Sequence, residues 1–227
     1  VIRIFVDKFP QTAKRLKIHS AGNGTLLHIL CRFSTDDVSW GYGNTTVEAL
    51  VRDLISVCHA DVNANDDSYR KPLHVLCRCG GSFEQFHSRS RFIRAFQLLV
   101  SSGASLNATS ANGWRGGRPL AILYSRVSDG MSISRVFEPC IEWAWKTKAL
   151  SASSWEETFD INAVDADGRT LLHRLPLGRV GGGTTLENIL TKLLSFGVGP
   201  SLHVKDNRGR DFFQMVCHES GFRCLSS

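Results

Sequence analysis

The sequence lacks both a long apolar run and any catalytic motif that can be identified by spacing. Its apolar stretches fall well short of the ~18 residues that a membrane helix needs, and Val1 to Pro10 lacks the basic start and long apolar centre of a signal peptide. There is no Gly-X-Ser-X-Gly elbow and no His-Glu-X-X-His zinc motif. We therefore expect no membrane span, no catalytic residues and no cofactor.

A regular cysteine framework is also lacking. The seven cysteines are an odd number without even spacing, and Cys31 and Cys77 lie in apolar runs where a small buried residue fits. Free buried thiols suit a reducing compartment. We therefore predict a cytoplasmic protein, with the nucleus as the alternative.

A zinc site is a more specific interpretation of some of these cysteines. Imidazole and thiolate are good zinc ligands, and His74 is followed by Cys77 and Cys79, with His28 and Cys31 as candidate partners. The His-X-X-Cys spacing, however, occurs at the same point of two repeated segments, which a structural role predicts. We therefore assign no metal ligand.

The remaining motifs give little support for catalysis. The glycine-rich stretch 178–185 precedes a predicted helix, but it lacks the Lys and Ser or Thr of a phosphate-binding P-loop. The acidic pairs at 36–37, 66–67 and 156–157 fall in turns or helix starts, where carboxylates favour the helix dipole. We interpret the first as a connector and the pairs as structural or solvated.

One segment recurs along the chain. Its clearest copy runs from Asp165 to His173 and reads Asp-Ala-Asp-Gly-Arg-Thr-Leu-Leu-His; other copies lie at 66–74 and 206–214, with partial copies at 22–28 and 116–121. A closing segment such as Val62-Asn63-Ala64 ends each repeat. A segment that recurs every few tens of residues is typical of a solenoid.

This pattern resembles the ankyrin repeat, in which a polar β-turn precedes Thr-Pro-Leu-His and two antiparallel helices. Asp165, Gly168, Thr170, Leu172 and His173 match in register. Equivalent positions are 46, 47, 52 and 41 residues apart, whereas the usual period is about 33, so each unit carries extra residues. The resemblance implies an all-α fold, an ankyrin-repeat α-solenoid of helix-turn-helix units joined by β-turn fingers.

We predict a single ankyrin-repeat domain over residues 1–227. It comprises a partial N-terminal repeat (1–21), repeat one (22–64), repeat two (65–108), an irregular repeat three (109–163), repeat four (164–204) and a partial C-terminal repeat (205–227). Predicted helices lie at 1–9, 26–33, 47–57, 72–79, 91–101, 119–125, 136–147, 186–196 and 211–218, with a short helix near Leu171. Insertions at 34–45, 80–90 and 178–185 are predicted to be loops.

The N-terminal segment is expected to belong to a longer array. The apolar stripe over 1–9 is typical of the second helix of a repeat, and Pro10 is expected to end it, with a turn region over 11–24. Because the first half of that repeat is missing, we expect upstream sequence in the parent protein to continue the array.

Several residues have clear structural roles in this pattern. Threonine before an apolar run can cap a helix, proline suits the first helical position, and glycine permits tight turns. The resemblance further implies that the motif histidines tie adjacent turns together. The structural set is Thr25, His28, Pro72, His74, Pro119, Gly168, Thr170, His173 and Gly209.

The predicted function is protein binding through the repeat surface. Basic and aromatic residues gather on or near the predicted fingers, and the resemblance implies that partners contact fingertips and first helices. We hypothesise that the fingers of a monomeric chain bind another protein, best an acidic segment, through Tyr69, Arg70, Trp114, Arg115, Arg169, Arg208 and Arg210. Reversal of Arg115, Arg169 and Arg208 to Glu is expected to slow association and leave the fold intact.

Two alternatives stay open. The basic fingers suit nucleic acid or anionic lipid, although the modest net charge of +6 makes nucleic acid the less favoured partner. The repeats also suit a targeting arm of a larger enzyme whose catalytic domain lies outside this chain.

Overall fold

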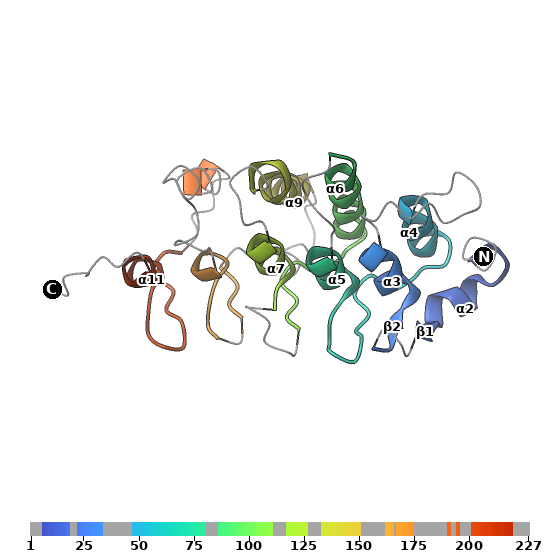
Figure 1. Cartoon of the computed structure of the whole chain (residues 1–227), viewed down its shortest axis with the longest axis horizontal. Coiled ribbons are helices and arrows are strands. Elements are labelled where there is room, and N and C mark those ends of the chain that lie inside the picture. Colours follow the sequence, from blue (N-terminus) through green and yellow to red (C-terminus); the bar gives the residue numbers. More distant parts are fainter. Residues whose placement is uncertain are drawn as a thin grey trace.

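The structure is a computed structural model that describes residues 6–18, 22–33, 47–79, 86–110, 117–126, 133–150, 162–165, 167–174, 190–191, 194–195 and 201–219. It is mostly helical, and Figure 1 shows an elongated array of two rows of helices with loops hanging from the lower row. The lower row contains α3 (Leu26–Phe33), α5 (Pro72–Cys79), α7 (Pro119–Arg126), the 3-10 helix η5 (Leu172–Arg174) and α11 (Phe212–Glu219). The upper row contains α4 (Val47–Ser56), α6 (Phe86–Ser101), the π-helix η3 (Ile133–Phe137) and α9 (Glu138–Leu150).

The lower-row helices are short apolar segments that pack side by side. In α5, leucines at 73 and 76 are fully buried, as are the corresponding Leu27 and Leu30 of α3. The α5 helix packs against both α3 and α7. Truncation of a fully buried leucine to alanine typically costs about 2–5 kcal/mol, so this contact row is a main source of stability.

The upper row covers the lower one with larger side chains. Phe92 and Phe96 of α6 are fully buried and stacked, with ring centroids 6.3 Å apart. The α6 helix contacts α4, α5 and α9. The core therefore runs continuously between the two rows rather than forming separate units.

The loops below the lower row are called finger loops here. The first is a β-hairpin in which β1 (Lys17–Ile18) pairs antiparallel with β2 (Gly24–Thr25). The second, fourth and fifth span 64–71, 163–170 and 204–211, and the third spans 108–118 with 111–116 outside the described residues. Figure 1 shows the fingers side by side along one edge of the molecule.

Three helix boundaries differ from the sequence-based predictions. The helical residues 6–8 end before Pro10, as predicted, but Pro10 also begins a further helix, α2 (Pro10–Arg15), where a turn region was predicted, because proline suits the first turn, where a missing N–H costs nothing. The α6 helix begins at Phe86, so residues 86–90 are not insertion; Ser88 is buried one turn before Phe92. The α9 helix runs on to Leu150.

Other predictions concern residues that the structure does not describe. These are the insertions 34–45 and 178–185, residues 80–85, residues 1–5, and most of the predicted helix 186–196. They stay predictions.

Direct backbone hydrogen bonds join neighbouring fingers. Asp67 N–H donates to Gly22 O, and Asn207 N–H donates to Asp167 O, both at 2.9 Å. Gly168 lies at this second contact with a φ of +71°, and a Cβ there would lie 2.5 Å from Asn207 Oδ1 and 2.9 Å from Asn207 N. Glycine is therefore required for both conformation and close approach.

Gly209 provides a matched control for this requirement. It has a φ of +75°, but a Cβ added there would meet no atom within 4 Å. We expect Gly209→Ala to cost about 1–2 kcal/mol for the left-handed conformation. Gly168→Ala should cost clearly more, because Asn207 must also move. Urea denaturation of both variants measures this, and equal losses would show that the fourth and fifth fingers are not in close contact.

Candidate binding surface on the finger loops

A buried aspartate organises each of three fingers. Asp66, Asp165 and Asp206 are all buried at the start of their turns. In each case Oδ1 accepts the backbone N–H groups two and four residues later, at 2.8–3.0 Å. The aspartate N–H in turn donates to the carbonyl four residues later, at 2.9–3.0 Å. One carboxylate oxygen therefore satisfies two backbone donors that the turn leaves without partners.

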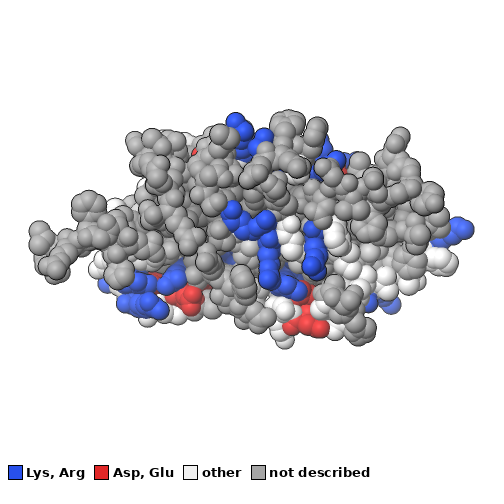
Figure 2. All heavy atoms as spheres, viewed as in Figure 1, with Lys and Arg blue, Asp and Glu red and all other residues white. Residues whose placement is uncertain are grey.

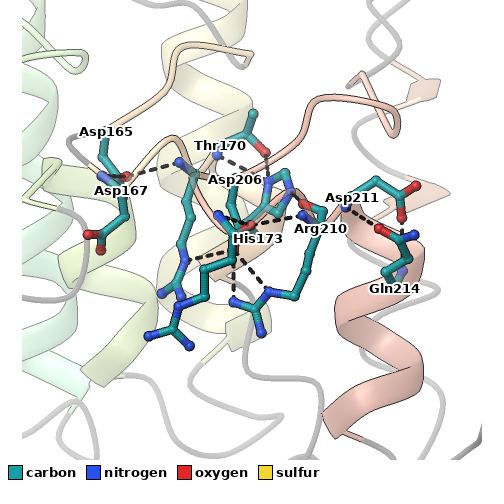
Figure 3. Close-up of polar contacts among 10 residues, drawn as sticks. Asp165, Asp167, Thr170, His173, Asp206, Arg210, Asp211 and Gln214 are labelled. Carbon is teal, nitrogen blue, oxygen red and sulfur yellow. Dashed lines mark hydrogen bonds and ion pairs between the residues drawn. The ribbon is translucent and has the colours of Figure 1, made fainter.

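The second carboxylate oxygen binds arginine. Asp66 Oδ2 accepts Arg70 Nε at 2.7 Å. Asp206 Oδ2 accepts Arg210 Nη2 at 2.8 Å and Nε at 3.2 Å, and Arg169 Nε of the preceding finger lies 3.5 Å away (Figure 3). Burial alone would raise the pKa of Asp206, but the hydrogen bonds from Arg210 and the backbone hold it well below its usual range.

This network changes the interpretation of three predicted binding residues. Arg70, Arg169 and Arg210 are only 28%, 20% and 24% exposed, and each pairs with a buried aspartate. We therefore expect Arg169→Glu to destabilise the fold, in contrast to the sequence-based expectation, because a glutamate would face the buried Asp206 carboxylate. Removal of one partner of a buried ion pair typically costs about 3–5 kcal/mol.

The other predicted binding residues divide into two groups. Arg208 and Tyr69 are exposed, and their side chains have no partner among the residues described. Trp114 and Arg115 lie outside the described residues. Arg70 and Arg210 pair with the aspartate of their own turn and Arg169 pairs with Asp206 of the next finger, whereas Arg208, two residues after Asp206, does not pair.

The motif histidines link each helix to the next finger. His28 Nδ1 accepts Thr25 N–H at 3.1 Å, and its Nε2 lies 2.9 Å from Arg70 O. His74 and His173 use the same atoms toward Lys71 N and Ala108 O, and toward Thr170 N and Arg210 O. Because an N–H can only donate and a carbonyl can only accept, Nε2 carries the ring proton in each case.

Two repeats replace the histidine with other groups. Gln214 Oε1 accepts Asp211 N–H at 3.0 Å while Asp211 Oδ1 accepts Gln214 N–H at 2.8 Å, which completes a capping box. In repeat three, where Ala121 stands at the histidine position, Arg118 donates to Val164 O of the next finger. In repeat three the link to the next finger is therefore kept although its chemistry changes, whereas the Gln214 contacts lie within its own helix start.

The closing segments contain a second link, which sequence reasoning did not identify. Asn63 Nδ2 donates to Gly103 O at 2.8 Å, and its Oδ1 accepts Ser105 N–H at 2.9 Å. Asn162 Oδ1 likewise accepts Ser201 N–H at 2.6 Å. The recurrence of asparagine in three of the four closing segments, at 63, 107 and 162, was the available signal.

The described residues do not offer the ligands that the zinc alternative needs. Both ring nitrogens of His28 and His74 are engaged by backbone groups. Burial raises the pKa of the Cys31 and Cys77 thiols well above the usual range, so they stay protonated. Among the residues placed by the structure, no group of three metal-binding side chains occurs.

The other described cysteines differ in their bonding state. Cys58, Cys79 and Cys140 are also free thiols, whereas Cys217 is disulfide-bonded.

None of the helices in the described ranges has both the length and the apolar character needed to cross a bilayer.

Comparison with protein-family models and with curated proteins finds no match to this chain.

The buried histidines predict a specific loss of stability in acid. Burial lowers the pKa of His74 from 6.5 to about 4, although its bond to Ala108 O opposes the shift. The unfolded chain therefore binds this proton first as the pH falls. The contribution of His74 should be complete above pH 6.5 and should decrease by roughly 3 kcal/mol as the pH falls to about 4.

His74→Gln tests this contribution, because Gln214 shows that glutamine can accept the same helix-start N–H. The difference in unfolding free energy between wild type and variant, measured by urea denaturation from pH 7 to pH 4, should shrink over this window. A difference that stays constant with pH would show that His74 does not titrate with unfolding.

Proposed function

We propose that this chain is a protein-binding module, an ankyrin-like solenoid whose finger loops together form the binding surface. The observation that carries the proposal is that equivalent fingers lie side by side and are hydrogen-bonded to one another, as at Asn207 N–H to Asp167 O. A partner that spans several fingers thus meets a continuous surface held in register.

The hydrogen bonds within each finger order the loop before a partner binds. Each described aspartate turn is closed by a buried carboxylate, and its exposed side chains project from a fixed backbone. A loop that is already ordered loses less entropy when a partner binds. The fingers are therefore preorganised for recognition although they contain little regular secondary structure.

The distribution of charge supports a protein partner. Figure 2 shows Lys and Arg beside Asp and Glu along the finger edge rather than a uniform basic stripe. Lys205 and Arg208 are exposed, yet the exposed Asp167 lies in the neighbouring finger. Mixed charge of this kind suits complementary side chains of a protein better than the continuous phosphates of nucleic acid.

A further group of basic residues has a structural explanation. Arg78 and Arg126 occupy the last turns of α5 and α7. Cations stabilise helix C-termini, and Arg126 Nη1 donates to Cys77 O of α5 at 3.3 Å. This group alone therefore does not favour a nucleic-acid partner.

A targeting role within a larger enzyme and a cytoplasmic or nuclear location remain compatible with the proposal.

Affinity capture from native extract tests the proposal. We expect proteins to be retained by the wild-type chain after nuclease treatment, and to associate more slowly with Arg208→Glu, because this exposed charge steers an acidic partner. The matched control is Arg135→Glu on η3, the same substitution at an exposed residue of the upper row, away from the fingers. Both variants should keep their unfolding free energy within about 0.5 kcal/mol.

Two results would contradict the proposal. Loss of all captured protein on nuclease treatment would point to nucleic acid as the primary ligand. An equal effect of Arg208→Glu and Arg135→Glu would show that the fingers are not the binding surface.

A further inference from the structure

One backbone position recurs in four fingers with a left-handed conformation. It is occupied by Asn23, Tyr69, Gly168 and Gly209, with φ angles of +52°, +55°, +71° and +75°. The last three also donate the same turn-closing hydrogen bond to the aspartate carbonyl three residues earlier, at 2.8–2.9 Å. The turns are therefore equivalent, and only the side chain differs.

Tyrosine is the costly choice at this position. Glycine adopts a positive φ freely and asparagine does so with little penalty, whereas a bulky side chain there is strained. Strain of this kind persists where the surrounding structure enforces it and is concentrated at functional sites. The Tyr69 side chain therefore needs an explanation that the turn itself does not provide.

The fold does not use the Tyr69 side chain. It is 60% exposed, and neither its ring nor its hydroxyl contacts any of the described residues through a hydrogen bond or ring contact. Asn23 provides a contrast, because its Nδ2 donates to Asp67 Oδ2 at 2.6 Å. At the equivalent position of the first finger, the side chain thus contributes to the structure, whereas that of Tyr69 projects from it.

We propose that Tyr69 is the anchor of the binding surface and receives an apolar side chain of a protein segment. This inference rests on the protein-binding function proposed above and names the chemistry of its partner. Tyrosine presents a large, rigid ring at a low entropy cost and is enriched among the residues that dominate interface energy. Its position on a preorganised turn holds the ring ready for contact.

The next residue specifies the partner further. Arg70 binds Asp66 through Nε alone, and its two terminal amino groups have no partner among the described residues. Guanidinium binds carboxylates with two parallel hydrogen bonds. The matching segment therefore carries an apolar side chain with an aspartate or glutamate next to it.

The surroundings disfavour a nucleobase as the occupant. Tyrosine can stack on bases, but the four charges around it cancel: Asp66 and Asp67 oppose Arg70 and Lys71. Asp67 is exposed, while Lys71 Nζ is engaged by Asn63 O at 2.9 Å. A phosphate chain would therefore meet an exposed carboxylate and no excess of positive charge beside the ring.

The substitution Tyr69→Gly separates binding from stability. Glycine removes the strain, so the unfolding free energy should stay the same or rise. A random dodecamer peptide library selected on the wild-type chain should yield peptides with an apolar residue beside a carboxylate. Affinity for the best peptide, measured by titration calorimetry, should fall at least ~10-fold in Tyr69→Gly, as expected for a residue that dominates an interface.

Two variants serve as controls. Val57→Ala truncates a similarly exposed apolar side chain just after α4, away from the fingers, and should leave peptide affinity unchanged. Tyr69→Phe keeps the ring and should retain most of the affinity.

Each contrary result has a distinct meaning. Unchanged affinity in Tyr69→Gly overturns the anchor while the proposed function stands, and a clear loss of stability shows that Tyr69 is structural. A library that enriches no peptide beyond those selected by an unrelated protein overturns the proposed function itself. If Tyr69→Gly loses binding to a labelled single-stranded oligonucleotide but not to peptides, the ring is a base-stacking site and the inference is wrong.

Discussion

The structure depends on one recurring interaction, a buried aspartate that closes the finger turn. Its carboxylate accepts two backbone N–H groups and, in two fingers, binds an arginine within the same turn. The turn then places a carbonyl, such as Arg70 O, where the histidine of the preceding repeat donates to it. Since the same histidine also accepts the first free N–H of its own helix, a helix start in one repeat is connected to the turn of the next. Loss of the aspartate would therefore disturb two repeats, which agrees with the nearest-neighbour coupling expected of repeat proteins.

The lower-row helices α3 and α5 could be predicted closely because the residues that mark their starts lie at the helices themselves. The predicted helices 26–33 and 72–79 coincide with α3 and α5, since Thr25 and Pro72 mark the starts and the histidine supports the first turn. The helix α2 that begins at Pro10 and the start of α6 were not predicted. Proline is compatible with both an end and a beginning, and Ser88 gives no apolar signal although tertiary packing buries it. Sequence placed the charged residues on the fingers but did not show which arginines are paired, because pairing depends on the turn geometry that orients the arginine toward the aspartate.

The residues of each finger divide into a buried pair and positions that project outward. The turn aspartate and the arginine four residues later, as at Asp206 and Arg210, form the buried pair, and the intervening positions project outward. Arg208 and Tyr69 both occupy outward positions, on a backbone whose conformation the buried pairs fix. The outward-facing side chains can differ among fingers without changing the turn, provided that the residue at the position with positive φ can adopt that conformation. The strained Tyr69 is therefore more informative about function than the arginines, whose number and position are largely explained by the fold.

Native-state amide hydrogen exchange tests the central role of the aspartate turns most directly. The amides of Arg70, Arg169 and Arg210 lie in surface loops, where rapid exchange is the ordinary expectation. Because each donates to a buried aspartate Oδ1 at 2.9–3.0 Å, we predict protection comparable to that of the α5 amides. Exchange at the rate of an unstructured peptide, with α5 still protected, would contradict the account and show that the fingers are not fixed by their aspartates.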